Sequence, residues 1–166
     1  MTSTANRGVA YYQCLDQHSG TALIEPATQQ QVSYAELEQR VSTCVDRIHE
    51  RVSDDVPVLM ALPFSRDIES VIGYLALLRA NIPTLLIDPQ LGETEKQSLF
   101  QSLEVCYEMT SGQPLPTGVS PTAHRDTEAN KGVLPALLLS TSGSSGNPKS
   151  VMLSLANLAA NTRQIL

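Results

Sequence analysis

The stretch Leu137–Ser154 reads LLLSTSGSSGNPKSVMLS, and its composition decides how the rest of the chain is interpreted. A run of leucines enters a segment with two glycines, five hydroxyl side chains (at 140–142, 144 and 145) and one lysine, and apolar residues resume after Ser150, at Val151. Glycines let a backbone turn through positive φ and approach a ligand closely. Amides and hydroxyls donate hydrogen bonds to oxygen, and a lysine adds positive charge. The stretch therefore predicts a strand, a polyphosphate-binding loop and a second strand.

Three other interpretations fit this loop less well. A Walker loop has a glycine where this chain has Pro148, and proline removes an amide donor and fixes φ at that position. An esterase G-x-S-x-G turn needs three residues between its glycines, whereas two residues separate Gly143 from Gly146. A flexible Gly/Ser linker would not sit directly between two apolar runs or contain Asn-Pro-Lys.

Outward from the loop, strand-like and helix-like segments alternate. Short apolar runs predict strands at Thr21–Glu25, Val58–Leu62, Thr84–Ile87, Val105–Tyr107 and Val133–Leu139. Helices are predicted from Ser33 to about His49, from Ile68 to about Asn81, and over Glu93–Leu103. Because the runs at 58–62 and 84–87 are apolar on both faces, this order predicts an α/β fold: a mostly parallel sheet flanked by helices.

Capping residues and a change of composition set the expected boundaries. Ser33 and Glu36 have the spacing of a capping box, and Ser65 or Asp67 can cap the next helix. Asp88 before Pro89 is expected to shape a turn. The chain divides into a lead-in (1–20), strand–helix repeats (21–109), a variable loop rich in Ser, Gly, Pro and Thr (110–132), and the strand–loop–strand–helix segment (133–166), all within one truncated domain.

Charge and composition exclude several classes of function. A net charge of −6 and a pI near 4.9 argue against nucleic-acid binding. The most apolar region, 71–87, is interrupted by Arg79, Asn81 and Pro83, so no membrane span is expected. Cysteines 14, 44 and 106 are too widely spaced for a disulfide framework or a metal site, and the polar start is unlike a signal peptide. These features predict a cytoplasmic protein without a bound metal.

The segment Ser140–Val151 closely resembles the phosphate-binding signature of the adenylate-forming superfamily, which includes acyl- and aryl-CoA ligases, fatty acyl-AMP ligases and peptide-synthetase adenylation domains. The usual form is T-[S/T]-G-[S/T]-[S/T]-G-x-P-K-G-V, followed by a strand and S-H-x-N-L; here the residues are Thr141–Val151 and Ser154–Leu158. The segments Val32–Leu37 and Val58–Pro89 are also similar to the family's opening helix start and its strand–helix–strand unit.

The resemblance implies an incomplete N-terminal subdomain of the ligase fold. It also implies an activity for the parent enzyme, in which ATP and a carboxylic acid give an acyl-adenylate and pyrophosphate with the help of Mg²⁺. By position, the residues that would hold phosphate are Thr141, Ser142, Gly143, Ser144, Ser145, Gly146 and Lys149.

Two departures and several missing motifs limit what the resemblance implies. Ser150 replaces the usual glycine, which would strain the loop if that position needed positive φ, and Leu155 replaces the usual histidine. The family's catalytic lysine, magnesium-binding residues and acid pocket lie downstream, so no catalytic or metal-binding residue is assigned and the chain alone is expected to be inactive. A non-catalytic phosphate-binding or protein-interaction module is the alternative. Half a sheet would leave Leu137–Leu139 uncovered, so self-association or pairing with the missing remainder is also expected.

Overall fold

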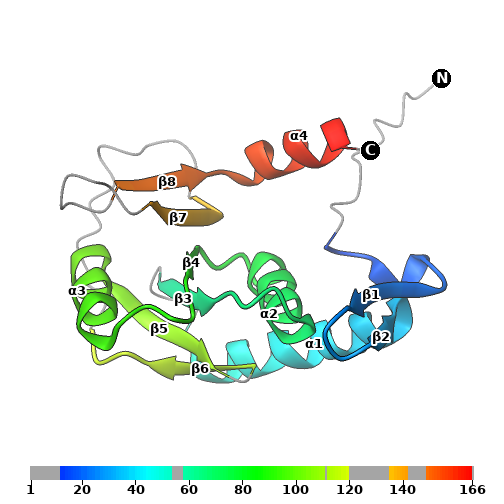
Figure 1. The fold of residues 1–166 in the computed structure, drawn as a ribbon, viewed down its shortest axis with the longest axis horizontal. Coiled ribbons are helices and arrows are strands. Elements are labelled where there is room, and N and C mark those ends of the chain that lie inside the picture. Colours follow the sequence, from blue (N-terminus) through cyan, green and yellow to red (C-terminus); the bar gives the residue numbers. More distant parts are fainter. Residues whose placement is uncertain (1–11, 54–57, 111, 120–134, 142–148, 166) are drawn as a thin grey trace.

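The computed structural model describes residues 12–53, 58–110, 112–119, 135–141 and 149–165. Within them lie a six-stranded sheet, ordered β6-β5-β3-β4-β7-β8, and a separate β1-β2 hairpin (Figure 1). The strands are β1 (Thr21–Glu25), β2 (Gln30–Ser33), β3 (Leu59–Pro63), β4 (Thr84–Ile87), β5 (Val105–Thr110), β6 (Gln113–Pro116), β7 (Leu137–Thr141) and β8 (Lys149–Leu153). The helices are α1 (Tyr34–Arg51), α2 (Ile68–Arg79), α3 (Glu93–Leu103) and α4 (Leu155–Ile165), after a short 3-10 helix at Leu15–Gln17.

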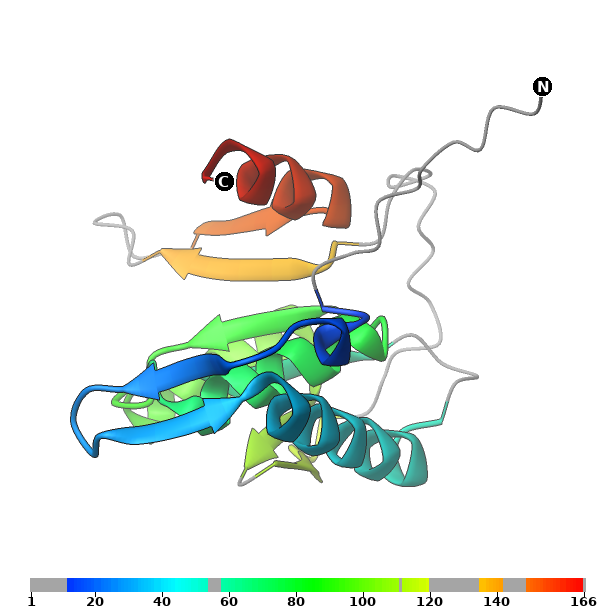
Figure 2. The same ribbon diagram turned by 90° about the vertical axis from the view of Figure 1, so that its right-hand side faces the viewer.

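The central part of the sheet is parallel, as predicted. β3 pairs in parallel with β4 and with β5, and β4 pairs in parallel with β7. The outer strands β6 and β8 are antiparallel to their neighbours. Figure 2 shows β7, β8 and α4 at one end of this arrangement, beyond β4. The predicted α/β class is therefore confirmed.

β3 forms the centre of the core because both of its faces are covered. Its residues Leu59 to Leu62 are at most 3% exposed. Leu59 and Ala61 pack in one apolar cluster with Leu99 and Phe100 of α3, whereas Met60 and Leu62 belong to a second cluster built mainly with α1 and α2. Helices therefore cover both faces of the sheet, as expected when a strand is apolar at every position.

The two predicted helix starts form with side-chain caps. The Glu36 amide donates to Ser33 Oγ at 3.2 Å, and the Ser70 amide donates to Asp67 Oδ1 at 2.7 Å, so Asp67 rather than Ser65 caps α2. The apolar face expected for α1 is buried through Leu37, Val41, Cys44 and Ile48, with Val45 partly buried. The capping residues and the apolar face predicted from the sequence therefore agree with where the helices begin and how α1 packs.

Two strands were not predicted from the sequence. β2 lies between the strand predicted at Thr21–Glu25 and the helix predicted from Ser33, and it pairs antiparallel with β1 in a hairpin whose turn has Gln29 at φ 60°. The prediction of a loop over 110–132 is wrong for its first part. Gln113–Pro116 form β6 there, which pairs antiparallel with β5. The sequence did not predict β6 because it contains two prolines. A proline has no backbone N–H to donate to a neighbouring strand, so it argues against a strand except at the edge of a sheet.

Leu137 and Leu138 are each 6% exposed, so the prediction that the segment 137–139 is uncovered is wrong for these two residues. β7 lies between β4 and β8 in the sheet, and Leu138 packs in the same apolar cluster as Leu59 and Phe100. No helix in the described part of the chain is long and apolar enough to span a membrane.

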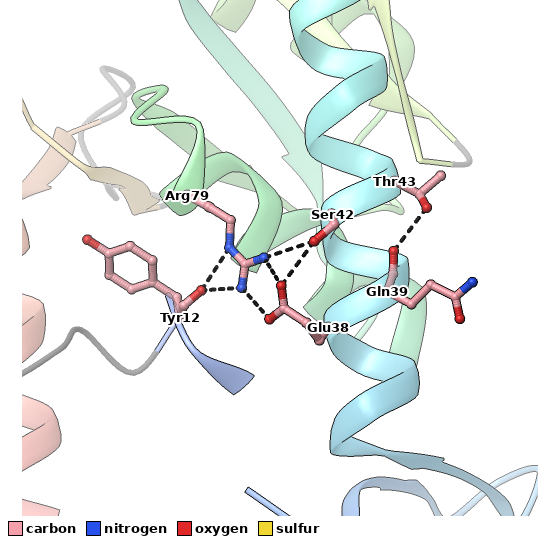
Figure 3. Close-up of polar contacts among 6 residues, drawn as sticks. All are labelled: Tyr12, Glu38, Gln39, Ser42, Thr43 and Arg79. Atoms are coloured by element: carbon pink, nitrogen blue, oxygen red, sulfur yellow. Dashed lines mark hydrogen bonds and ion pairs between the residues drawn. The ribbon is translucent and has the colours of Figure 1, made fainter. Parts of the chain in front are cut away.

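A charged clamp joins the lead-in to α1 and α2 (Figure 3). Arg79 of α2 donates to both carboxylate oxygens of Glu38 at 2.6 and 2.8 Å, to Ser42 Oγ at 3.2 Å, and twice to the Tyr12 carbonyl at 2.7 and 3.0 Å. The Arg79 hydrogen bond lowers the pKa of Glu38 more than burial raises it. Because Arg79 and Glu38 side chains are only 17% and 23% exposed, the clamp is screened less than a surface pair.

We expect Arg79→Ala to lower the free energy of unfolding by about 2 kcal/mol, because charge-assisted hydrogen bonds are removed and Glu38 loses its partner. Arg79→Lys is the matched control: it keeps the charge but not the planar fork, so its loss should be smaller. Urea titrations followed by circular dichroism measure both. Equal stability of wild type and Arg79→Ala would contradict the clamp's role.

The clamp should also depend on pH. The folded-state pKa of Glu38 is lowered, so its contribution is present above the unfolded carboxyl's pKa, about 4.3, and is lost as pH falls below it. The difference in free energy of unfolding between wild type and Glu38→Gln should therefore shrink between pH 7 and pH 3. A difference that stays constant over this range would assign the stabilisation to packing instead.

Candidate phosphate-binding hairpin

The predicted phosphate-binding residues fall where β7 gives way to β8. The two strands pair antiparallel from Leu137 opposite Leu153 to Thr141 opposite Lys149. Thr141 and Lys149 are therefore the last facing pair of the ladder, and the chain between them begins and ends at neighbouring positions. Ser142, Gly143, Ser144, Ser145 and Gly146 lie outside the described residues, as do the side chains of Thr141 and Lys149. The assignment of these seven residues to a phosphate site thus stays a prediction.

This hairpin starts at the carboxyl edge of the parallel strands. Leu62 of β3, Leu86 of β4 and Leu139 of β7 are successive neighbours across the sheet. Their strands consequently end on one side, where open α/β sheets bind their ligands. The turns after β3 and β4 also emerge there, with Arg66 and Asp88 exposed.

Asp88 has a structural task at this edge. Its Oδ1 accepts a hydrogen bond from the Gln90 amide at 2.8 Å, which stabilises the turn after β4 and confirms the prediction. Arg66 has φ 61°, a left-handed conformation that is unusual for a non-glycine residue. Sequence reasoning did not single out Arg66, because no local pattern marks such a turn.

The charge of the hairpin segment differs from that of the whole chain. Residues 129–166 contain Lys131, Lys149 and Arg163 but no Asp or Glu, although the net charge of the chain is −6. Every carboxylate side chain therefore precedes this segment in sequence. The charged side chains of the segment itself are therefore all positive, and Asp88 is the carboxylate that follows β4, the neighbour of β7, at the same edge.

The two departures from the signature have structural explanations. Ser150 faces Ser140 in the regular β7–β8 ladder and is not among the described residues with positive φ, so serine causes no backbone strain there. Leu155 packs against the α1/α2 cluster and borders a small cavity of about 20 Å³ together with Leu78, Ile82 and Ala136. An apolar residue suits that position.

A second hollow, of about 420 Å³, lies along α1 and was not predicted. It is bordered by α1, the first turn of α2 and the β5–β6 turn at Gly112. Arg40 bridges it by ion pairs with Glu36, at 3.8 Å, and with Glu69. Cys44 is buried there; its thiol contacts the Gly112 carbonyl oxygen, and burial raises its pKa. The charges in this groove are largely paired with one another.

Other residues with potential chemistry have structural roles in the described part of the chain. His18 lies against Tyr34, with ring centroids 5.1 Å apart. Cys44 and Cys106 are buried and unbridged, whereas Cys14 is unbridged and only partly buried. No group of three or more potential metal ligands occurs among the described residues. His124 lies outside the described ranges.

Comparison with known proteins now adds independent findings. No family model matches the chain. In sequence it is similar to tyrocidine synthase 3 of Brevibacillus parabrevis, with 30% identity over 150 residues that cover 80% of this chain and 2% of that protein.

Solved structures with similar folds cover nearly the whole chain. O-succinylbenzoate coenzyme A synthetase (MenE) from Bacillus subtilis, in complex with AMP, matches 93% of the chain and 44% of its own length, with TM-score 0.70 and 17% identity. ATP-bound MatB from Rhodopseudomonas palustris matches 94% and 37%, with TM-score 0.67 and 22% identity. The Klebsiella oxytoca NpsA N-terminal subdomain matches 87% and 41%, with TM-score 0.63 and 22% identity.

The fold is that of the N-terminal subdomain of adenylate-forming ligases. The sequence similarity to a segment of tyrocidine synthase 3 agrees with this fold, and both findings agree with the resemblance inferred from the loop. It spans less than half the length of each of these three structures and 2% of the curated relative.

Because Ser150 lies in a strand, we expect Ser150→Gly to destabilise the chain by about 0.5–1 kcal/mol, although glycine is the usual residue of the signature. Ser140→Gly, the facing position in β7, is the matched control and should have a similar effect. Thermal unfolding measures both. If Ser150→Gly raised the melting temperature while Ser140→Gly lowered it, Ser150 would be a strained loop residue.

Proposed function

We propose that the β7–β8 hairpin binds the phosphates of ATP in an enzyme that activates a carboxylic acid. In the reaction, a carboxylate oxygen bonds to the α-phosphorus, the bond from that phosphorus to the bridging oxygen breaks, and pyrophosphate leaves with the electron pair. The observation that carries the proposal is the hairpin's place at the carboxyl edge of a sheet shared with ligases whose structures hold ATP or AMP.

Each candidate residue has a distinct task in this proposal. The amides and hydroxyls of Thr141, Ser142, Gly143, Ser144, Ser145 and Gly146 donate hydrogen bonds to β- and γ-phosphate oxygens. Lys149 neutralises the charge that builds up on the departing pyrophosphate. The segment's lack of carboxylates favours this, because nothing within it repels the anion.

In this proposal Mg²⁺ would bind together with the phosphates of ATP, and no residue of this chain is assigned as its ligand. The described residues contain no cluster of carboxylates, histidines or cysteines that would fit it. Mg²⁺ is commonly held by substrate phosphates together with one or two carboxylates, and it supplies charge neutralisation when bound. The identity of the acid is left open, and a cytoplasmic location belongs to the same proposal.

A non-catalytic phosphate-binding module is the second candidate, because the hydroxyl- and glycine-rich segment needs no further catalytic group to bind an anion. The two candidates agree on nucleotide binding and differ on turnover.

Replacing Lys149 with Ala should weaken binding of ATP and of inorganic pyrophosphate by roughly 10- to 100-fold, because a charge-assisted hydrogen bond contributes about 1.5–3 kcal/mol. Isothermal titration calorimetry of the 166-residue chain measures both ligands. Arg51→Ala, an exposed cation at the end of α1, is the matched control and should leave affinity unchanged. Equal affinities for wild type and Lys149→Ala would exclude the assigned role.

Exchange of labelled pyrophosphate into ATP tests turnover. With a panel of carboxylic acids, we expect none from this chain alone, since the family's catalytic lysine and acid pocket are not in its sequence. Acid-dependent exchange by the isolated chain would overturn the expectation of inactivity and would exclude the non-catalytic alternative.

A further inference from the structure

Arg66 lies in the turn between β3 and α2, and hydrogen bonds hold the residues on either side of it. The Ser65 amide donates to Ser70 Oγ at 3.0 Å, and the Ser70 amide donates to Asp67 Oδ1 at 2.7 Å. Between these contacts Arg66 has φ 61°, is exposed, and makes no ion pair with any other described residue. The turn therefore presents a cation that the described part of the protein does not neutralise.

The positive φ of Arg66 is not explained by the elements beside it. The other described non-glycine residues with positive φ are Gln29, Asn81 and Glu104. Gln29 lies in the β1–β2 turn, whereas Asn81 and Glu104 follow the ends of α2 and α3, where a left-handed residue commonly ends a helix. Arg66 precedes a helix instead, and an N-cap needs no positive φ. Strain that the local structure does not require is a reason to look for a function.

The register of the sheet brings Arg66 to the same edge as the hairpin. Leu62, Leu86 and Leu139 are neighbours across β3, β4 and β7; Arg66 follows β3, and Thr141 ends β7. Only β4 separates β3 from β7, so the ends of these two strands lie about 10 Å apart at about 4.8 Å per strand. This separation is comparable with the length of a nucleotide's triphosphate, so one nucleotide can reach both the hairpin and the turn after β3.

The charges along this edge favour a second cation for such a ligand. Lys149 lies opposite Thr141 in the ladder, and Asp88 follows β4, between the hairpin and Arg66 in strand order. The Asp88 carboxylate accepts the Gln90 amide but makes no ion pair with a described residue, so its charge repels a phosphate chain. Arg66, on the far side of Asp88, offsets that charge and leaves the edge with two cations and one carboxylate.

We propose that Arg66 binds the α-phosphate of the nucleotide whose β- and γ-phosphates are held by the β7–β8 hairpin. This inference rests on the proposed function of the hairpin and adds a second contact point to it. The hairpin holds one end of the triphosphate, and Arg66 holds the phosphate whose phosphorus the carboxylate attacks. A guanidinium donates parallel N–H bonds to two phosphate oxygens, so it orients that group as well as neutralising it.

Calorimetric titration with ATP and with inorganic pyrophosphate separates the two contact points, because pyrophosphate lacks the α-phosphate. Arg66→Gly should weaken ATP binding about tenfold, as expected for one lost charge-assisted hydrogen bond, and should leave pyrophosphate binding unchanged. Glycine adopts positive φ without strain, so this variant should keep the fold, which its melting temperature checks. Arg66→Lys keeps the charge and should lose less affinity for ATP. Asn81→Gly makes the same kind of backbone change before β4, at the opposite edge, and is the matched control; both affinities should be unchanged.

The outcomes separate this inference from the proposed phosphate site. Weaker ATP binding by Arg66→Gly with pyrophosphate binding retained supports it. Unchanged affinities for both ligands overturn it and leave the hairpin to be judged by Lys149→Ala. Equal losses for both ligands also overturn it, because Arg66 would then contact the phosphates assigned to the hairpin. Wild type that binds neither ligand overturns the phosphate site itself, and this inference with it.

Discussion

The structure depends on the parallel pairing of β3, β4 and β7 under helices on both faces. Leu62, Leu86 and Leu139 are neighbours in this ladder, and the strands around them are buried at most positions. A one-residue shift would exchange the side chains of the two buried clusters, and close packing against the helices on each face opposes that exchange. The register therefore fixes where β7 ends, and with it the point at which the hydroxyl- and glycine-rich segment leaves the sheet.

Much of this fold could be predicted because local and long-range signals agree. Thr21–Glu25 and Thr84–Ile87 form strands with the predicted bounds, and α3 forms over Glu93–Leu103. The two strands that were not predicted, β2 and β6, were missed for the same reason. β2 is polar and β6 contains prolines, so pairing with β1 and with β5, and not their own composition, keeps them extended. A strand stabilised by its neighbour leaves no apolar alternation to detect.

The candidate site also has features that depend on local sequence and features that depend on tertiary contacts. Sequence could identify the segment, because glycine, hydroxyl and lysine side chains have intrinsic chemistry at fixed spacing. It could not identify Arg66, whose place at the carboxyl edge depends on β3 lying beside β4. Nor could it predict the groove along α1, since that hollow forms only where α1, α2 and the β5–β6 turn meet.

The signature itself contains two kinds of position. Lys149, Ser150 and Val151 are in β8 and pair with β7, so their backbone is set by the ladder. Residues 142–148 lie between the two strands in sequence and outside the described residues. A substitution in the first group changes a side chain on a fixed backbone, which explains why serine can replace glycine at 150 without strain. Serine at position 150 is therefore compatible with the pairing of β7 and β8.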